Sequence, residues 1–486
     1  MEKDTKTGYL IMDIGTGNVR VALVRPDGAV LDVKRENVLY EKDTGYPESI
    51  YFDPEQLWEQ IIRLSGKVLK NSPGVTVRAL TATSQREGIV LLDSRGNPLI
   101  GLPNIDHRGR EWESLITDPD SVYQLTGRYP SSLFSAFKLV GIRQRRPELW
   151  TRFSYFMSIS DWIEFRLSGV PHYEPAQASE TLLYDVEKGR WSDRLCDLFQ
   201  LSTAILPELR ASGTVLGGIL PDRARELGVS GEAVVIVGGA DTQLAVRSTQ
   251  PSLDDVIIVS GTTTPIVKVT GNYLTDPAQR TWTNRHATAG SFILEANAGV
   301  TGLNYQRLKE IFYPNEGYDV IEAELAETDH SQCVASLGSL IASEKAPLTR
   351  GGFIFDAPVS HRLTRSSFVF ATLWDIACSI RENYSILCEV SGHDQDHVWA
   401  CGGGVQSRTL RQFIASLLNK KIQIRNSYRQ SSVVGGAFIC NEALGEAEHL
   451  PETTEIVEPA AQSAYAALYE RWKKTRDAFK QTYRDA

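Results

Sequence analysis

Two glycine- and threonine-rich turns with similar flanks lie about 245 residues apart in the chain. Residues 13–20 read Asp-Ile-Gly-Thr-Gly-Asn-Val-Arg and residues 260–264 read Ser-Gly-Thr-Thr-Thr, each between two apolar, β-branched runs. This pattern predicts a β-hairpin at each place. Glycine allows close approach of a ligand to the backbone, successive N–H groups form an anion-binding concavity, and threonine hydroxyls add uncharged donors. We therefore interpret the pair as a clamp on a polyphosphate, with ATP as the first candidate.

The residues of these turns form the first set of candidate contacts. Asp13 directly precedes the first turn, where a carboxylate could hold a Mg²⁺ ion that keeps its water shell. A dinucleotide-binding fingerprint fits less well, because the third glycine is missing and β-forming residues follow where a helix should begin. A plain hairpin turn explains either segment alone, but not the pair. The candidate phosphate contacts are Gly15, Thr16, Gly17, Asn18, Arg20, Gly261, Thr262 and Thr263.

Three consecutive glycines, Gly402, Gly403 and Gly404, lie between a predicted strand at 398–400 and a predicted helix at 408–418. Such a turn directs backbone N–H groups and the helix N-terminus toward a ligand, and it lets a flat ring lie against bare backbone. A tight strand-to-helix turn is the better explanation of this run taken singly. Its value as a nucleotide contact depends on the two phosphate turns.

Asp241 ends an apolar predicted strand at 234–237 and follows two glycines. A carboxylate at the end of such a strand can face a cleft between domains, where it could accept the proton of a substrate hydroxyl that attacks a γ-phosphate. The alternative is an N-cap for the helix that is predicted to begin at Thr242, which is the usual role of a single aspartate at a helix start.

Gln85, Arg86 and Glu87 lie between two predicted strands, at 77–83 and 89–92. A guanidinium, a carboxylate and an amide within three residues suit the adjacent hydroxyls of a small polyol. The alternative is a surface ion pair, although apolar strands on both sides favour a half-buried position. Asp106 lies in a polar segment that either contacts the same substrate or forms a turn. With Asp241 and Thr242, these residues are our candidate substrate contacts.

The remaining pattern indicates two α/β domains. Asp53 and Pro54 cap a predicted helix at 55–69, and a further helix is predicted at 159–167. The pattern is interrupted near 247–254, which predicts domains at 1–247 and 248–486. An aromatic and aliphatic stripe at 461–483 predicts a docked terminal helix without a chemical role.

Composition restricts the function classes. A length of 486 residues suits two domains, and a net charge of −9 argues against nucleic acid or an anionic membrane as partner. The six cysteines are scattered, which is typical of reduced thiols. Residues 1–7 carry no apolar leader pattern, and no apolar run approaches membrane-span length. We expect a soluble, cytoplasmic protein that acts on a small molecule. The sequence leaves the oligomeric state open, with a homodimer as one option.

These motifs, in this order, resemble those of the FGGY carbohydrate kinases over essentially the whole chain. The family's first phosphate pattern matches Asp13 through Arg20, its second resembles Ser260–Thr264, and its catalytic aspartate falls on Asp241. Its adenosine stretch matches residues 402–412, which adds Ser407 to the candidate ATP contacts. The resemblance implies two actin-like (ribonuclease H-like) ATPase domains on either side of a catalytic cleft. It also implies ATP- and Mg²⁺-dependent phosphorylation of a primary hydroxyl.

The acceptor is less closely defined by the resemblance. Residues 85–87 are similar to the Gln-Arg-Glu segment of glycerol kinases, whereas the longer stretches 86–91, 104–108 and 159–162 look more like autoinducer-2 kinases, which act on a linear dihydroxy-dione. A pentulose such as xylulose is also compatible. Leu133 replaces the tyrosine with which glycerol kinases contact glycerol, which counts against a glycerol- or erythritol-type polyol kinase.

The chain departs from the family pattern at two further places. Gly141 stands where a tryptophan is expected, and residues 355–358 replace the family's Gly-Glu-Arg loop.

Two other function classes remain. An actin- or Hsp70-like nucleotide switch would need no second polar site, whereas residues 85–87 and Asp241 supply one. A silent sugar sensor would be expected to lose Asp241 or one phosphate turn, and this chain keeps both.

Overall fold

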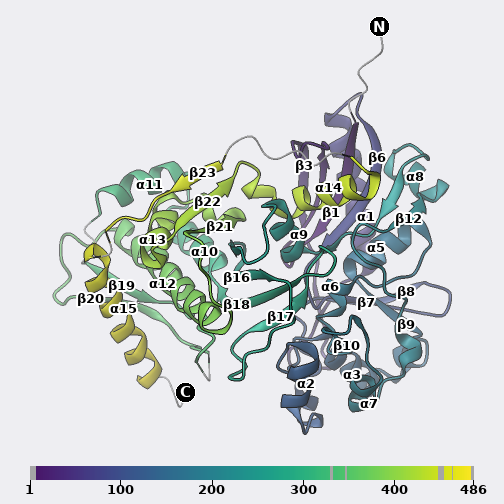
Figure 1. Cartoon of the computed structure of the whole chain (residues 1–486), viewed down its shortest axis with the longest axis horizontal. Coiled ribbons are helices and arrows are strands. Elements are labelled where there is room, and N and C mark those ends of the chain that lie inside the picture. The colour runs from purple at the N-terminus through teal and green to yellow at the C-terminus, as the bar shows by residue number, and fades with distance from the viewer. Residues whose placement is uncertain (1–6, 329–331, 345–346, 447–453, 462, 483–486) are drawn as a thin grey trace.

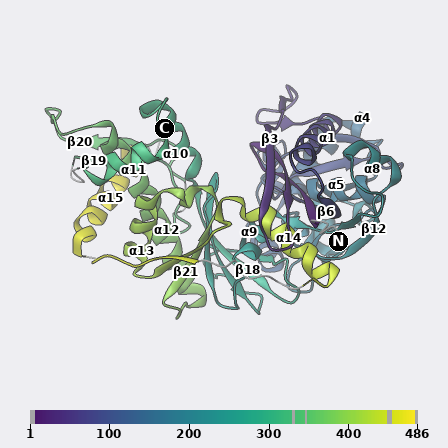
Figure 2. The same cartoon turned by 90° about the horizontal axis from the view of Figure 1, so that it is seen from above.

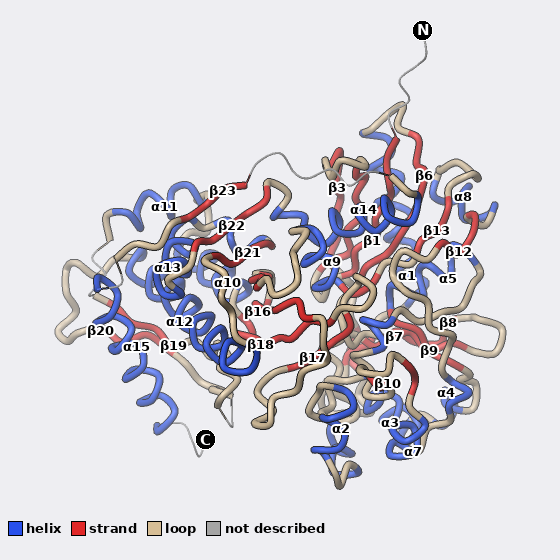
Figure 3. The backbone as a smooth tube through the Cα atoms, in the orientation of Figure 1, coloured by secondary structure: helices blue, strands red, loops and turns tan. Residues whose placement is uncertain are grey.

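Two seven-stranded β-sheets, one in each of two lobes, form the framework of the protein (Figure 1). The computed structural model describes residues 7–328, 332–344, 347–446, 454–461 and 463–482, so the first six residues and Tyr483 lie outside the described part. The strands lie at the centre of each lobe with most helices around them (Figure 3). From above, the two lobes lie beside each other and meet along one side (Figure 2).

The first sheet carries the first Gly-Thr turn. Its strand order is β12-β13-β6-β1-β2-β3, with β14 also paired to β6. β1 pairs antiparallel with β2 and parallel with β6, which confirms the first predicted hairpin. β1 is buried along almost its whole length, as expected for an apolar strand covered on both faces. The bounds are β1 Thr7–Ile14, β2 Asn18–Val24, β3 Val30–Asn37, β6 Thr76–Ser84, β12 Val215–Gly218, β13 Val234–Ile236 and β14 Gly239–Ala240.

The second sheet repeats this arrangement. β15 pairs antiparallel with β16 and parallel with β21, just as β1 pairs with β2 and β6. The segments β3-β2-β1-β6-β13 and β18-β16-β15-β21-β22 therefore share one order and one set of directions, which confirms the predicted pair of like domains. The bounds are β15 Val256–Val259, β16 Thr263–Thr270, β17 Trp282–Arg285, β18 Phe292–Val300, β21 His397–Cys401, β22 Lys421–Arg425 and β23 Thr454–Val457.

Helices cover both sheets. α1 (Pro54–Asn71) begins as predicted, with the Asp53 side chain accepting from the Glu55 N–H, and packs against β2 and β3. α5 (Ile159–Ser168) packs against β6, and α9 (Asp241–Ser248) follows β14 directly. In the second lobe, the long helix α12 (Arg365–Ser391) and α13 (Arg408–Leu418) contribute to one hydrophobic core with β15, β16 and β21.

One late helix crosses back to the first lobe. α14 (Ser431–Leu444) packs against α9, β1 and β6, as Figure 1 shows, and Val433 and Ala437 share a core with Tyr9. Gly435 permits this contact, because a Cβ there would lie 1.8 Å from the Leu244 carbonyl oxygen. By sequence, α14 belongs to the predicted domain 248–486, but it packs against elements of the first lobe.

A third, smaller sheet supports the segment after β6. It has the order β8-β7-β9, with bounds β7 Ile89–Leu92, β8 Pro98–Leu102 and β9 Tyr155–Ser158. The other strands are β4 Glu41–Lys42, β5 Ile50–Tyr51, β10 Tyr184–Asp185, β11 Arg190–Trp191, β19 Cys333–Ser336 and β20 Gly352–Phe355. The other helices are α2 Pro119–Thr126, α3 Ser135–Arg145, α4 Pro147–Trp150, α6 Pro175–Ala178, α7 Asp193–Phe199, α8 Pro221–Leu227, α10 Gly302–Phe312, α11 Tyr318–Ala326 and α15 Ser463–Thr482.

The terminal helix α15 docks as predicted. Trp472 is buried and donates through Nε1 to Asp375 Oδ1 of α12 at 2.7 Å, while Tyr465 and Leu468 pack against the same core. Among the described residues, no helix combines the length and the apolar character needed to cross a bilayer. All six cysteines are free thiols.

Candidate active site

The first Gly-Thr turn connects β1 and β2 and is exposed at its tip. The Gly15 N–H donates to the Asn18 carbonyl at 3.0 Å, which closes the turn, and Gly17 is exposed. The Thr16 hydroxyl exchanges hydrogen bonds with the Asn104 side chain, at 2.9 and 3.2 Å. The Tyr40 hydroxyl donates to the Thr16 carbonyl at 2.7 Å. The turn is thus a fixed loop held from its flanks, with its tip open to a ligand.

Asp13 lies at the base of this turn, fully buried. Arg20 is its direct partner across the β1–β2 ladder, and the register brings the guanidinium onto Asp13 Oδ2. The Ser432 hydroxyl, from the first turn of α14, donates to the same oxygen. Within the described part of the chain, Asp13 Oδ1 has no hydrogen-bond partner. Sequence reasoning did not identify Ser432, because this contact spans 419 residues and a serine near a helix start has many roles.

The second Gly-Thr turn and the glycine run lie against each other. The Gly404 N–H donates to the Ser260 carbonyl at 2.8 Å, and the Ser260 N–H donates to the Cys401 carbonyl at 2.8 Å. A Cβ at Gly402 or Gly404 would lie 2.3 Å or 2.1 Å from Ser260 atoms, so packing within the protein explains both glycines. Gly403 is exposed, and a Cβ there would meet nothing within 4 Å. The protein itself therefore gives no packing reason for glycine at position 403.

Two further features bear on the ATP candidates. The N-terminus of α10 lies beside the second turn, because Thr301 and Leu303 both donate backbone N–H groups to the Thr262 carbonyl, at 3.2 and 3.3 Å. Sequence reasoning did not identify this helix start. The Ser407 side chain caps α13 by accepting from the Leu410 N–H at 3.2 Å, and it donates to Glu322 at 2.6 Å. These contacts explain Ser407 by helix capping and give no support to its nucleotide role.

Asp241 lies at the carboxyl end of β14, in the first turn of α9. Because Ala240 pairs with Ser84 in a parallel ladder, Asp241 and Gln85 leave the same edge of the sheet beside each other. Asp241 Oδ1 accepts from the Thr242 N–H at 2.7 Å, and the N-cap position is occupied by Ala240. Burial raises the pKa of Asp241 to about 6, with the Arg86 charge lowering it and the Asp13 charge raising it. Ile14 pairs with Ser84 from the other side of β6, so the first Gly-Thr turn leaves the same edge of the sheet as Gln85 and Asp241.

Arg86 is buried, but its partners differ from those expected. Its two terminal nitrogens donate to the two oxygens of Glu295 on β18, at 2.5 and 3.0 Å, and Glu180 lies 3.5 Å away. The alternative interpretation of Arg86 and Glu87 as a surface ion pair is therefore wrong, because Arg86 is buried and makes a contact between the two lobes. Residues 86 and 295 are too far apart in sequence for a local pattern to connect them.

Glu87 keeps a carboxylate without a hydrogen-bond partner among the described residues and is 6% exposed. Its backbone is left-handed, with φ of 61°, an unfavourable conformation for glutamate that is often found at functional sites. Burial and the nearby Glu180 charge raise the pKa of Glu87, against the opposing charges of Arg86 and Arg128. Glu87 is thus the member of the 85–87 segment best placed to accept from a ligand hydroxyl.

The other two substrate candidates serve the fold. Gln85 Oε1 accepts from the Asn104 N–H at 2.9 Å, so this side chain fixes the loop around residue 104 beside the first Gly-Thr turn. Asp106 is fully buried and accepts from the Ile50 N–H at 3.0 Å and from Arg108 Nε at 2.8 Å. These bonds explain Asp106 as a structural residue, and none of them points to a substrate.

A buried charge cluster that the sequence did not reveal surrounds Glu87. Arg128 donates to both oxygens of Glu180, at 3.0 and 2.6 Å, and lies over the Trp282 ring at 4.5 Å. Lys138 donates through Nζ to the Leu133 carbonyl, and burial lowers its pKa. Every guanidinium of this region is paired with a carboxylate.

Comparisons with known proteins agree with this arrangement. The family models for the N-terminal and C-terminal domains of the FGGY family of carbohydrate kinases match residues 8–247 and 321–444. YoaC of Bacillus subtilis (strain 168), whose name describes a sugar kinase, is 52% identical and covers 97% of each chain.

More distant relatives carry more specific names. A Staphylococcus epidermidis xylulose kinase is 25% identical over 98% of this chain and 97% of its own, and a Salmonella typhimurium autoinducer-2 kinase is 24% identical over 96% and 94%. A solved gluconate kinase of Lactobacillus acidophilus has the same fold, with a TM-score of 0.83, 18% identity and coverage of 98% and 99%.

Proposed function

Because the chain belongs to the FGGY family of carbohydrate kinases and is a sugar phosphotransferase, we propose that it transfers the γ-phosphoryl group of ATP to a primary hydroxyl of a small neutral ketose or linear dihydroxy-dione. The observation that carries this proposal is the position of Asp241. It leaves the sheet beside residues 85–87 and lies near Asp13 at the base of the first phosphate turn. A single carboxylate thus adjoins both the candidate acceptor residues and the candidate phosphate residues.

Asp241 is proposed as the general base. With a pKa of about 6, its carboxylate is mostly ionised at neutral pH and still basic enough to accept a hydroxyl proton as the phosphoryl group leaves ATP. The bond from Thr242 to Oδ1 fixes the carboxyl plane, which leaves Oδ2 for the acceptor. Thr242 therefore acts through Asp241, and we retain it as a positioning residue.

Asp13 is proposed to hold Mg²⁺ through water. The residues present fit this ion, because Asp13 Oδ1 is a buried carboxylate oxygen without a protein partner, while Oδ2 is fixed by Arg20 and Ser432. When bound, Mg²⁺ supplies charge neutralisation for the phosphate oxygens. Arg20, through its bond to Asp13, keeps this carboxylate oriented.

The two turns and the glycine run are proposed as the ATP contacts. The exposed tips at Gly17 and at Gly261–Thr263 offer backbone N–H groups and hydroxyls without added charge. Gly403 is proposed to lie against the adenosine, because its bare backbone faces open space while both neighbouring glycines are explained by packing.

The charge balance favours a neutral acceptor over a sugar acid. Arg86 and Arg128 are already neutralised by Glu295 and Glu180, whereas Glu87 and Asp241 have carboxylate oxygens to spare. Such a site can accept hydrogen bonds from hydroxyls. Among the described residues, Arg86 and Arg128 are already paired, so a carboxylate substrate would meet only the Lys138 amine, which donates to the Leu133 carbonyl. Leu133 adds no hydroxyl for glycerol, so we place the linear dihydroxy-dione and pentuloses such as xylulose before glycerol and erythritol.

A panel assay tests this proposal. ADP release is followed with saturating ATP and Mg²⁺ for D-xylulose, D-ribulose, the linear dihydroxy-dione, glycerol and erythritol, with gluconate as the anionic comparison. We expect turnover with one of the neutral five-carbon substrates and none with gluconate. Turnover restricted to gluconate contradicts the neutral-acceptor argument, and the absence of turnover with every compound contradicts the kinase proposal.

The cytoplasmic location and the homodimer suggested by the sequence stay predictions.

A further inference from the structure

The ladder between β6 and the strand that leads to Asp241 is interrupted at one place. β13 pairs with β6 at Val234–Ala79 and Val235–Leu80, and β14 resumes the pairing at Gly239–Thr83 and Ala240–Ser84. Between the two, the Ala82 and Gly238 N–H groups both donate to one oxygen, Oε1 of Glu164 on α5, at 2.9 and 2.8 Å. A buried carboxylate therefore closes the gap between the two strands.

The interruption lies directly behind the candidate active site. Three residues after Ala82 comes Gln85, and three residues after Gly238 comes Asp241. Gly238 is pressed against β6, since a Cβ there would lie 1.9 Å from the Ala82 carbonyl oxygen. Glu164 thus bridges the two strands directly behind the Gly239–Thr83 and Ala240–Ser84 pairs, after which the acceptor segment and the proposed base leave the sheet.

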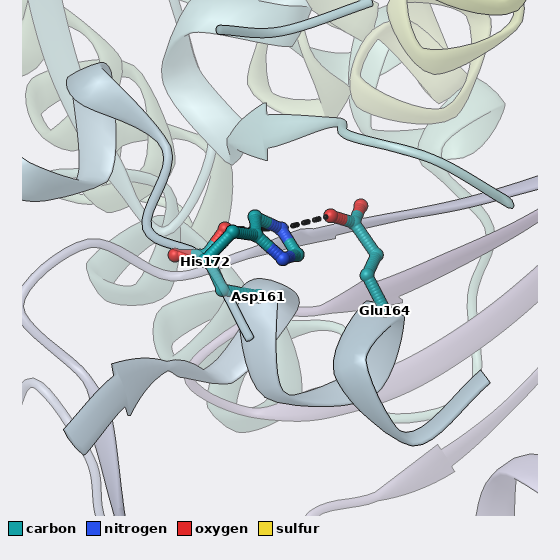
Figure 4. A group of neighbouring side chains, drawn as sticks. All are labelled: Asp161, Glu164 and His172. Atoms are coloured by element: carbon teal, nitrogen blue, oxygen red, sulfur yellow. Dashed lines mark hydrogen bonds and ion pairs between the residues drawn. The ribbon is translucent and has the colours of Figure 1, made fainter. Parts of the chain in front are cut away.

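His172 neutralises this carboxylate. Its Nε2 lies 3.0 Å from Glu164 Oε2 and 3.3 Å from Asp161 Oδ1, and its Nδ1 lies 3.1 Å from the Val170 carbonyl (Figure 4). With both carboxyls ionised, a carbonyl and two carboxylates only accept, so both ring nitrogens donate and the ring is an imidazolium. Burial raises the pKa of Glu164, and the hydrogen bond and charge of His172 lower it. Burial lowers the pKa of His172, but its hydrogen bonds to Asp161 and Glu164 outweigh burial and raise it to about 10.

The cluster extends to the outer side of the same turn. Asp161 Oδ2 accepts from the Glu174 N–H at 3.2 Å. The Glu174 carboxyl carbon would lie 3.4 Å from a Cβ at Gly239, and Glu174 accepts from the Ser212 hydroxyl at 3.0 Å. The glycine turn before Asp241 is therefore enclosed by carboxylates that are themselves fixed.

We propose that Glu164, held by His172, is a positioning residue for phosphoryl transfer that sets the spacing between residues 85–87 and Asp241. The inference rests on the proposed function of these residues. A displacement of about 1 Å between reacting groups can lower a rate by about 10²-fold. Glu164 can therefore affect kcat through the position of the two strands, without touching the substrate.

A metal site is the other interpretation of this cluster, because Asp161, Glu164 and His172 bring ligand-type atoms within 4.8 Å of one another. Glu164 Oε1 already accepts two backbone N–H groups and Oε2 accepts from His172. An ion would have to displace the imidazolium proton, so we assign the cluster to hydrogen bonding.

Two variants of Glu164 separate position from charge. Glu164→Asp keeps the charge and the attraction to His172, but its shorter side chain withdraws the acceptor from the two backbone N–H groups. Glu164→Gln loses the charge but keeps an oxygen at the same reach. We expect Glu164→Asp to lose kcat by about 10- to 100-fold with an unchanged KM for ATP, and Glu164→Gln to keep kcat close to wild type.

The matched control is Asp375→Asn in the second lobe. Asp375 is equally buried and accepts from Trp472 Nε1 at 2.7 Å and from the Ser339 hydroxyl at 3.0 Å, away from the candidate site. We expect it to lower Tm without changing kcat. Hydrogen exchange of peptides that cover 79–85 and 236–241 should accelerate in Glu164→Asp and not in Asp375→Asn.

The outcomes distinguish this inference from the proposed function. If the wild type phosphorylates no acceptor, the proposed function fails. A different outcome overturns only the positioning role of Glu164. In that outcome the wild type is active and Asp241→Asn is inactive, but Glu164→Asp keeps the wild-type kcat and the wild-type rate of hydrogen exchange. Equal losses of kcat in Glu164→Asp and Glu164→Gln also overturn it, because the loss would then not depend on whether the side-chain oxygen keeps its reach to the two backbone N–H groups. A rise of Tm with Zn²⁺ or Mn²⁺ that His172→Gln abolishes would establish the metal interpretation instead.

Discussion

The Arg86–Glu295 contact allows a prediction with a worked magnitude. Both carboxylates around Arg86 are buried, so Arg86→Ala leaves Glu295 without its bidentate partner and weakens the neutralisation of Glu180. Breaking a buried ion pair in this way costs about 3–5 kcal/mol. At about 2–4 °C of Tm per kcal/mol for lobes of this size, the Tm should fall by about 6–20 °C.

The pH dependence of this loss has a defined sign. In the wild type, burial raises the pKa of Glu295, but the Arg86 charge outweighs burial and the net effect is a lowered pKa. The ionised Glu295 therefore stabilises the fold above its unfolded pKa of about 4.3, and this stabilisation is lost as the pH falls through the folded pKa. In Arg86→Ala burial is opposed only by the Arg128 charge and the Asn297 hydrogen bond, so the pKa of Glu295 rises relative to the wild type and protonation is favoured. The Tm difference between the two proteins should therefore narrow from pH 7 to pH 5.

Calorimetry and steady-state kinetics together test this prediction. The acceptor KM should rise far more than the ATP KM, because Arg86 adjoins Glu87 and Asp241. Glu295→Ala serves as the partner variant, and the double variant should be less destabilised than the sum of the two single variants. An unchanged Tm, additive losses in the double variant, or equal increases in both KM values would refute the reasoning.

Three further predictions follow from the other contacts. Gly403→Val should weaken ATP binding, measured by calorimetry, and leave the Tm unchanged. Gly402→Ala should lower the Tm, because Gly402 has a φ of 93° and a Cβ there would clash with Ser260. Unchanged ATP affinity in Gly403→Val would rule out the adenosine assignment. Asp13→Asn should raise the Mg²⁺ concentration needed for half-maximal activity, and an unchanged requirement would remove Asp13 from the metal site. The Asp241 carboxylate must be ionised to accept a proton, and its pKa is about 6. The kcat/KM for the acceptor should therefore fall about tenfold per pH unit below pH 6. A pH profile that is flat down to pH 5 would exclude Asp241 as the base.

The sequence predicted the parts of the site that local pattern determines. Both Gly-Thr hairpins, the strand before Asp241 and the helix after Gly404 formed as expected, because apolar β-branched runs, glycine turns and an aspartate cap act over a few residues.

The contacts that hold the site together could not be predicted in this way. Arg86 finds Glu295 across 209 residues, and Asp13 finds Ser432 across 419, so only the return of α14 and the docking of β18 reveal them. Glu164 and His172 appear in the sequence as ordinary helix and loop residues. Their role arises because a gap in the β6 ladder leaves two backbone N–H groups to be satisfied.

The same limit applies to single candidate residues. An ion pair between Arg86 and Glu87 was the alternative interpretation of this segment, but Arg86 bonds to Glu295 instead, and no local pattern indicates that partner. Ser407 and Asp106 were chosen from family pattern and local polarity, whereas helix capping and a buried arginine account for their bonds. A polar residue near a ligand loop is often part of the support of that loop.

The central claim is that Asp241 accepts the proton of the acceptor hydroxyl, and Asp241→Asn tests it most directly. The amide keeps the shape and the oxygen that accepts from Thr242, but it cannot take up a proton. General-base assistance is typically worth about 10²–10⁴ in rate. We therefore predict a loss of kcat in that range in the ADP-release assay, with ATP affinity and Tm close to wild type. A kcat near the wild-type value, or a variant that fails to fold, would contradict the account and leave Asp241 as a helix-start residue.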